Sequence, residues 1–165
     1  MAAVERVEPG PGQESVWDYP RPPRVEPTPK LAVVRIGGVT VAESRRCLRV
    51  LETASPPAIY FPPGDVREDL LAPGDGATFC EWKGTASYRD VVVGGWRVAE
   101  AAWTYLRPNP RYAELAGYLA FYPGRVDECR LDGEPVRPQP GTYYGGWITD
   151  DIVGPFKGEP GTGRW

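Results

Sequence analysis

The sequence predicts a single, mainly β domain with one or two short helices, and three features lead to this prediction. Glycine and proline each account for 20 of the 165 residues, so turns must be frequent. Six tryptophans, nine tyrosines and four phenylalanines nevertheless require a core or a pocket to hold them. The apolar residues fall in short runs between the turn residues, which is typical of strands rather than of long helices.

Residues 1–29 are predicted to form a proline-rich N-terminal arm that packs on a single body of residues 30–165. The prolines between Pro9 and Pro29 exclude a regular helix or a central strand. Exposure of the Trp17 and Tyr19 rings to water would be unfavourable, so we expect both residues to contact the body. In the alternative interpretation, the arm is a ligand for the groove of a partner protein.

The first half of the body is predicted to consist of strands joined by tight turns. The β-branched stretch 31–41, interrupted by Gly37-Gly38, predicts a hairpin. Residues 47–51 fit either a strand or a short helix, whereas residues 58–61 fit a buried strand. An acidic residue at the start of the stretch 65–71 favours one or two helical turns there.

The second half alternates further strands with one short helix. Alanines in the stretch 96–106 favour a helix, but its aromatic residues also fit a strand, so both remain open. Asn109, followed by proline, predicts the cap of a helix that ends near Leu115. Asp132-Gly133 predicts the turn of a hairpin over residues 125–136. Extended segments are also expected at 77–82, 86–93 and 118–122.

Charge and hydropathy narrow the range of partners. The net charge of −3 gives no indication of the basic surface that nucleic-acid binding requires. No apolar run approaches the length that spans a bilayer, and no charged-then-apolar leader is visible at the N-terminus. We therefore expect a cytoplasmic protein that binds neither nucleic acid nor membranes. A small-molecule ligand is the partner that we expect, and the oligomeric state is left open.

The absence of histidine and the dispersal of the cysteines argue against metal chemistry. The sequence has no His, and Cys47, Cys80 and Cys129 are too far apart to suggest a disulfide framework. A structural zinc site needs about four nitrogen or sulfur ligands, which three dispersed thiols cannot supply. We therefore predict no metal and no other cofactor. Any acid–base catalyst would have to be Asp, Glu, Lys, Tyr or Cys.

The best candidate site is the stretch from Cys80 to Tyr88, which is expected to be a hairpin. Alternate strand residues share a face, so Trp82 would lie on the opposite face from Lys83 unless the turn re-aims the lysine. Gly84 permits a tight turn, and Tyr88 could return beside Lys83 across the hairpin. In the alternative interpretation, Trp82 and Tyr88 are core partners across the strands and Lys83 is solvated.

Other aromatic residues could extend this site into a pocket. The predicted ligand-binding residues are Tyr60, Trp82, Lys83, Tyr88 and Trp103. Further wall residues could be Trp96, Tyr143, Tyr144 and Trp147, although each aromatic residue taken singly fits a core position better. Aromatic cages bind cations, cyclic imides or bases by stacking. The function predicted from these residues is a binding module for a small molecule or a modified group.

Two alternatives remain beside this binding module. The first is an enzyme in which Lys83, Tyr88 or Cys80 carries out proton transfer or nucleophilic attack in the same pocket. A reactive thiolate at Cys80 would need a nearby cation, and Lys83 is the nearest in sequence. The second is a protein-interaction domain that uses the proline-rich arm. In the charged stretch 43–52, an arginine could bind an acidic ligand, but ion pairs on a solvated face explain these charges better.

The stretch Cys80-Glu81-Trp82-Lys83-Gly84-Thr85-Ala86-Ser87-Tyr88 resembles the bacterial domain-of-unknown-function family 427, and the resemblance extends from about Ser15 to the C-terminus. Its other markers are the stretches 17–23, 49–53, 60–63, 65–66, 119–123, 132–134 and 145–149. The resemblance implies a β-tent-like fold, in which two antiparallel sheets meet at an angle. Similar folds occur in the drug-binding domain of cereblon and in B-type methionine sulfoxide reductases. Many such relatives hold zinc with paired Cys-x-x-Cys motifs, which this sequence lacks.

The same family is also labelled a nucleotidyltransferase family, and the residues do not support that activity. Two-metal nucleotidyl transfer needs acidic residues that converge on paired cations, usually as Asp-x-Asp after a Gly-Ser turn. Asp150 and Asp151 are adjacent and would splay apart on a strand, and Asp132 is explained by its hairpin turn. The sequence also lacks the phosphate-binding loop and the serine nucleophile elbow.

Overall fold

The computed structural model describes residues 4–165 and confirms a mainly β protein built from antiparallel sheets. The larger sheet has seven strands in the order β2-β5-β6-β10-β9-β8-β7, and the second has four in the order β12-β11-β3-β4. Two small ladders, β1-β15 and β13-β14, add to these sheets. The strands are β1 (Glu14–Ser15), β2 (Arg24–Thr28), β3 (Ala32–Ile36), β4 (Val39–Ser44), β5 (Cys47–Leu51), β6 (Ala58–Phe61), β7 (Leu71–Cys80), β8 (Gly84–Val93), β9 (Trp96–Thr104), β10 (Leu119–Phe121), β11 (Glu128–Leu131), β12 (Glu134–Pro135), β13 (Arg137–Pro138), β14 (Trp147–Ile148) and β15 (Ile152–Val153).

Both hairpins predicted from turn residues are present. Strands β3 and β4 are antiparallel around Gly37 and Gly38, whose φ angles of 58° and 76° suit glycine. Strands β11 and β12 are joined by Asp132 and Gly133, which also have positive φ. The stretch that fitted either helix or strand is strand β9, because it pairs with β8 on one side and β10 on the other.

The helices are short and of the 3-10 type. They are η1 (Val16–Asp18), η2 (Pro63–Asp65), η3 (Glu68–Leu70) and η4 (Pro110–Leu115). The helix predicted after Asn109 is therefore present, but the Asn109 side chain makes no capping hydrogen bond. No helix within residues 4–165 has the length and apolar character needed to cross a membrane.

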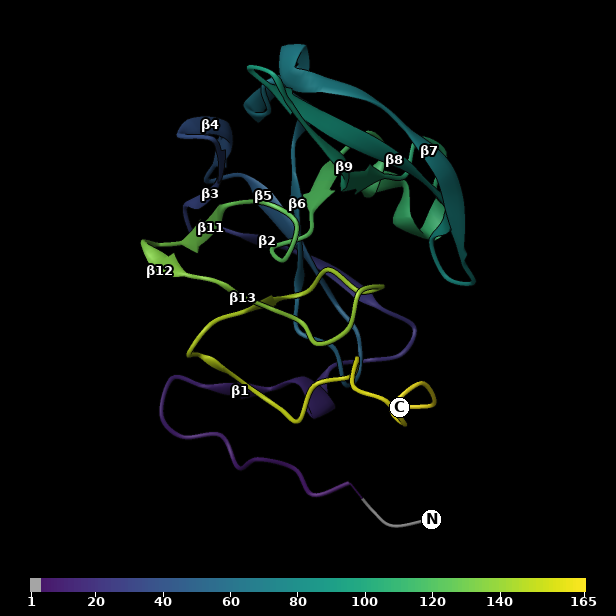
Figure 1. The fold of residues 1–165 in the computed structure, drawn as a ribbon. Coiled ribbons are helices and arrows are strands. Elements are labelled where there is room, and N and C mark those ends of the chain that lie inside the picture. The colour runs from purple at the N-terminus through teal and green to yellow at the C-terminus, as the bar shows by residue number, and fades with distance from the viewer. Residues whose placement is uncertain (1–3) are drawn as a thin grey trace.

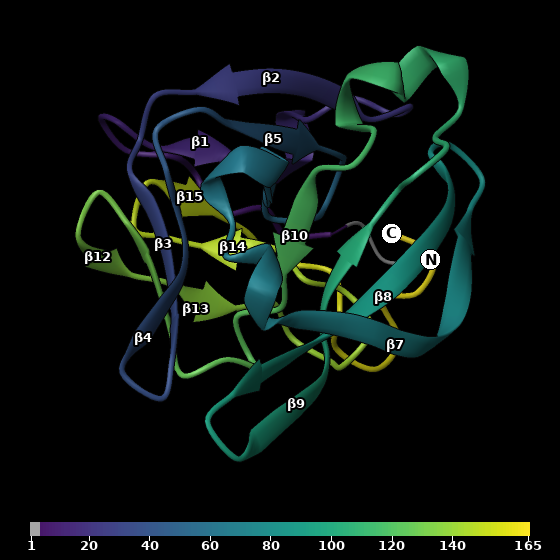
Figure 2. The same ribbon diagram turned by 90° about the horizontal axis from the view of Figure 1, so that it is seen from above.

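The long strands β7–β9 arch over one end of the molecule, and the N-terminal segment lies beside the C-terminal tail at the other (Figure 1). Strand β1 pairs in parallel with β15, and the Val7 amide donates to the Gly154 carbonyl. In the part of the chain that the structure describes, strand β2 pairs with β5 alone, so Pro27 lies on an edge strand, where its missing N–H is tolerated. Viewed from above, the large sheet curves from β2 and β5 through β10 to β7 and β8 (Figure 2).

Alternate residues of the large sheet separate two apolar clusters. Ile59, Phe61 and Phe121 belong to the main core, which lies between this sheet and the four-stranded sheet. Tyr60 and Trp103 belong to a second cluster that is rich in tyrosine. Because successive side chains on a strand point to opposite faces, the second cluster lies on the face turned away from the main core. This face carries the candidate site.

Candidate functional site

All five predicted ligand-binding residues line one hollow of about 270 Å³, which we call the aromatic pocket. The residues concerned are Tyr60, Trp82, Lys83, Tyr88 and Trp103. The structure brings them together from β6, the β7–β8 turn, β8 and β9. The C-terminal segment 143–146 and Lys157 complete the wall.

The register of the large sheet aligns the rings that form the floor of this pocket. Tyr60 lies opposite Ala120, Ala120 lies opposite Trp103, and Trp103 lies opposite Tyr88. The small Ala120 leaves room above β10, so Tyr60 and Trp103 meet edge to face with centroids 5.9 Å apart. The Trp103 indole N–H donates to the Tyr60 hydroxyl at 3.0 Å. Hydrogen bonding and packing therefore fix both rings in place.

Tyr88 and Tyr122 continue the floor. Their rings stack with centroids 6.5 Å apart, and the Tyr122 hydroxyl donates to the Tyr88 hydroxyl at 3.5 Å. The Tyr88 hydroxyl also lies 3.0 Å from the Thr78 hydroxyl on β7. The centroid of Tyr122 lies 4.6 Å from that of Trp103. Tyr122 was not predicted from the sequence, because it lies just beyond β10 and its facing depends on the tertiary packing.

The β7–β8 turn brings Lys83 to the same side as Trp82. Strand β7 ends at Cys80, so the strict alternation expected for a strand does not continue through residues 81–83. Asn109 holds this turn, since its side-chain amide donates to the Trp82 carbonyl at 2.7 Å. Its backbone N–H donates to the Lys83 carbonyl at 2.9 Å. The asparagine that we expected to cap a helix thus docks the hairpin tip instead.

Lys83 is a cation within this aromatic environment. Its ammonium nitrogen lies 5.8 Å from the centroid of the Tyr105 ring. Burial opposes the charge, but the Tyr60 hydroxyl and the Cys80 thiol hold the pKa of Lys83 above its ordinary value. Within residues 4–165 the ammonium forms no ion pair. The pocket therefore presents a positive charge that no carboxylate of the described chain neutralises by direct pairing.

The C-terminal wall depends on two glycines in a tight space. A Cβ atom at Gly145 would lie 2.5 Å from two ring carbons of Trp103, and one at Gly146 would lie 2.5 Å from Pro56. Only glycine lets this segment approach the floor so closely. Tyr143 and Tyr144 stand at the rim and meet edge to face with centroids 4.9 Å apart. The Gly145-Gly146 pair can be recognised in the sequence, but its proximity to Trp103 cannot.

Two of the aromatic residues considered as wall extensions lie elsewhere. Trp96 is 80% exposed at the start of β9 and does not line the pocket. Trp147 is buried in the main core, where its indole N–H donates to the Phe121 carbonyl at 3.1 Å. Trp147 thus occupies the core position that fitted each ring taken singly, whereas Trp96 lies neither in a core nor in the pocket wall. The sequence identifies the rings, but only the tertiary structure assigns each one to a position.

The three cysteines have different surroundings. Burial raises the pKa of Cys47 and of Cys129 to about 12, which keeps both thiols protonated at neutral pH. Cys80 is partly exposed and borders the aromatic pocket. Within residues 4–165, no group of three or more Cys, Asp or Glu side chains is arranged to hold a metal ion.

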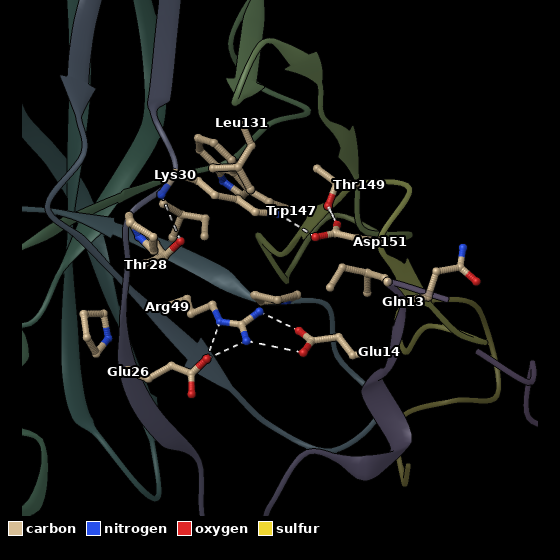
Figure 3. Close-up of a pocket in the computed structure, with 16 residues that line it drawn as sticks. Gln13, Glu14, Glu26, Thr28, Lys30, Arg49, Leu131, Trp147, Thr149 and Asp151 are labelled. Atoms are coloured by element: carbon tan, nitrogen blue, oxygen red, sulfur yellow. Dashed lines mark hydrogen bonds and ion pairs between the residues drawn. The ribbon is translucent and has the colours of Figure 1, made fainter. Parts of the chain in front are cut away.

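A second hollow, of about 320 Å³, lies between the N-terminal segment, β2, β5 and the C-terminal tail (Figure 3). We call it the arm pocket. Its charged wall residues are Glu14, Glu26, Lys30, Arg49 and Asp151. Arg49 contacts Glu14 and Glu26, each at 2.5 Å, and Lys30 donates to Asp151 at 2.5 Å. Within the charged stretch 43–52, Arg49 therefore pairs with carboxylates of the protein itself.

Comparison with known proteins gives a family but no activity. No curated protein matches the chain. A family model described as a domain of unknown function (DUF427) matches residues 24–132, a span that contains all five predicted pocket residues. The rim tyrosines, Gly145, Gly146 and Lys157 lie beyond the matched span. Since the match covers more than half of the sequence and agrees with the resemblance seen in its motifs, the chain belongs to the DUF427 family.

Proposed function

We propose that the protein is a binding module that takes a small organic molecule into the aromatic pocket. The observation that carries this proposal is the row of rings from Tyr60 through Trp103 to Tyr88, which is fixed by hydrogen bonds and still borders an open hollow. Small-molecule sites are typically concave and mostly apolar, with a few placed polar groups. The aromatic pocket is concave and has a floor of aromatic rings, with Lys83 and Lys157 among the polar groups of its wall. Its volume suits a ligand of one or two rings.

The rigidity of the floor supports binding. Tyr60, Tyr88 and Trp103 lie on paired strands and are each at most 8% exposed, so they keep their positions without a ligand. A preformed site does not lose side-chain freedom when a ligand enters, and this raises affinity for a given contact area. Trp82 differs, because it is half-buried at the mouth, where it can close over a bound ring.

The charge state of Lys83 favours binding over nucleophilic catalysis in this pocket. A lysine acts as a nucleophile or base only when it is neutral, and neighbouring groups keep the pKa of Lys83 above its ordinary value. The ammonium is instead suited to attract and orient a ligand. We also retain the cytoplasm as the proposed location, where free thiols such as Cys47 and Cys129 remain reduced.

The test is a titration of tryptophan fluorescence with a library of small cyclic compounds. Replacement Trp82→Ala should weaken the binding of each hit about tenfold, because it removes one stacking surface. Trp96→Ala is the matched control, since it deletes the same side chain at an exposed position outside the pocket. Its dissociation constants should equal those of the unmodified protein.

Two results would contradict the proposal. Hits that bind Trp82→Ala as tightly as the unmodified protein would lie outside the aromatic pocket. A library without any hit, repeated by ligand-observed NMR so that a silent fluorescence change is not overlooked, would remove the proposed function altogether.

A further inference from the structure

The distribution of lysine in this protein is uneven. Only three of its 19 basic residues are lysines, and all three line one of the two hollows. Lys30 lies in the arm pocket and is paired with Asp151 at 2.5 Å. Lys83 and Lys157 line the aromatic pocket, and neither forms an ion pair within residues 4–165. The uncompensated lysine charge therefore lies at the candidate site.

The acidic residues of the same wall offset this charge only in part, because neither pairs directly with a lysine. Glu52 is engaged by Arg21, with 3.7 Å between the guanidinium Nε and a carboxylate oxygen. Glu81 is exposed on the β7–β8 turn, where water screens its charge. The two lysines are half-buried, so the fields of their ammonium groups are screened less than that of Glu81. The two ammonium groups consequently remain available for direct pairing with an anion that enters the pocket.

The aromatic neighbours accommodate the ammonium groups without neutralising them. Lys83 lies 5.8 Å from the Tyr105 centroid, and Lys157 lies 5.1 Å from the Tyr144 centroid. These separations are near the outer range of effective cation–π contact, which contributes only modestly at accessible sites. Both cations remain able to pair with an anion that enters between them and the ring floor.

On this basis we infer that the ligand is a small planar organic acid, whose ring lies against Trp103 and whose carboxylate pairs with Lys83. The inference rests on the proposed binding function and deepens it. A carboxylate fits better than a phosphate, since phosphate sites usually present several free backbone N–H groups or an arginine fork. The amide of Gly146, in the pocket wall, already donates to the Gln139 side chain at 3.0 Å.

Two pairs of probes test this inference. Benzoate is compared with benzamide, and 2-naphthoate with 2-naphthamide, so that each pair differs mainly in charge. We expect each acid to bind the full-length protein at least tenfold more tightly than its amide. The replacement Lys83→Met, which keeps much of the apolar stem, should abolish that preference. Raising the salt concentration should weaken only the acids.

Lys30→Met is the matched control, because it removes the same charge from the other hollow. It should preserve the preference for the acid. Phenyl phosphate is the third probe, and binding tighter than that of benzoate would overturn the carboxylate assignment. Equal binding of acids and amides would overturn the charge inference but leave the pocket intact. Failure of all probes, with library hits still sensitive to Trp82→Ala, would reject planar acids as ligands without touching the proposed function.

Discussion

The arm pocket and the aromatic pocket are similar in size but differ in how their charged residues are paired. The arm pocket encloses about 320 Å³ and the aromatic pocket about 270 Å³, so volume alone would favour the former as a binding site. In the arm pocket, Arg49 and Lys30 are already paired with carboxylates of the chain. In the aromatic pocket, Lys83 and Lys157 have no such partner among residues 4–165. The pairing of charges therefore distinguishes a joint between chain segments from the pocket that we propose as a binding site.

The arm pocket joins segments that are distant in the sequence. Glu14 precedes β2, Glu26 lies within it, and Arg49 lies on β5, so one guanidinium connects three segments. The Glu14 carboxylate also accepts a hydrogen bond from Tyr19 at 2.6 Å. Nearby, the Trp17 indole N–H donates to the Pro155 carbonyl at 2.9 Å. These contacts hold the N-terminal segment against the rest of the protein.

The largest effect that we expect comes from breaking this joint with Arg49→Met. The Arg49 side chain is only 22% exposed, so the replacement leaves the partly buried Glu14 without its cationic partner. Glu26 keeps only the more exposed Arg24, at 3.4 Å. We expect the free energy of unfolding to fall by about 2–3 kcal/mol, as measured by urea denaturation. Arg107→Met, at an exposed position, is the control and should change it by less than about 0.5 kcal/mol. An unchanged midpoint in Arg49→Met would contradict the role of the arm pocket as a joint.

A second prediction tests whether the aromatic pocket has a defined shape. In Gly145→Ala, the new Cβ would lie 2.5 Å from ring carbons of Trp103. Overpacking of this kind typically costs about 1–3 kcal/mol, and we expect about 2 kcal/mol together with a changed near-ultraviolet circular dichroism signal. Gly95→Ala is the control, because the position that its Cβ would take has no atom within 4 Å. Equal stabilities of the two variants would show that Trp103 can move and that the floor is not rigid.

The fold could be predicted from the sequence better than the contacts that form the aromatic pocket. Turn pairs such as Gly37-Gly38 and Asp132-Gly133 determine hairpins locally, so both hairpins could be predicted. Strand β9 could not be distinguished from a helix, because its alanines have helical preferences that only pairing with β8 and β10 overrides.

The pocket residues could be chosen by type but not by contact. Trp82, Lys83 and Tyr88 share one hairpin, so local reasoning could group them. Tyr60 and Trp103 join them only through the register of β6, β10 and β9, which the sequence does not reveal. Trp96 has the same side chain as Trp103 but lies at the other end of the strand in solvent. Aromatic character is therefore necessary, but not sufficient, to identify a residue of the pocket floor.

The smallest effect that we predict is a difference between the arm pocket and the aromatic pocket in their response to low pH. Burial raises the pKa of Glu14, but hydrogen bonds from Arg49 and Tyr19 outweigh it and leave the pKa below the ordinary 4.5. Burial likewise opposes ionisation of Asp151, yet hydrogen bonds from Lys30 and Thr149 bring its pKa below 3.8. Both carboxylates are thus more acidic in the folded than in the unfolded state. Their contribution to stability is complete above those ordinary values and is lost as the pH falls through the lowered ones.

Unlike these carboxylates, Lys83 keeps its charge throughout this acidic range. Lowering the pH from about 6 to about 3 should therefore loosen the arm pocket before the aromatic pocket. Hydrogen exchange, corrected for the intrinsic effect of pH, should speed up in peptides covering residues 4–23 while peptides covering 84–93 stay protected. In Glu14→Gln, which cannot titrate, the acid-induced part of this change should shrink. If both regions lost protection together, the two hollows would form one cooperative unit, and the contrast between a joint and a binding site would have to be given up.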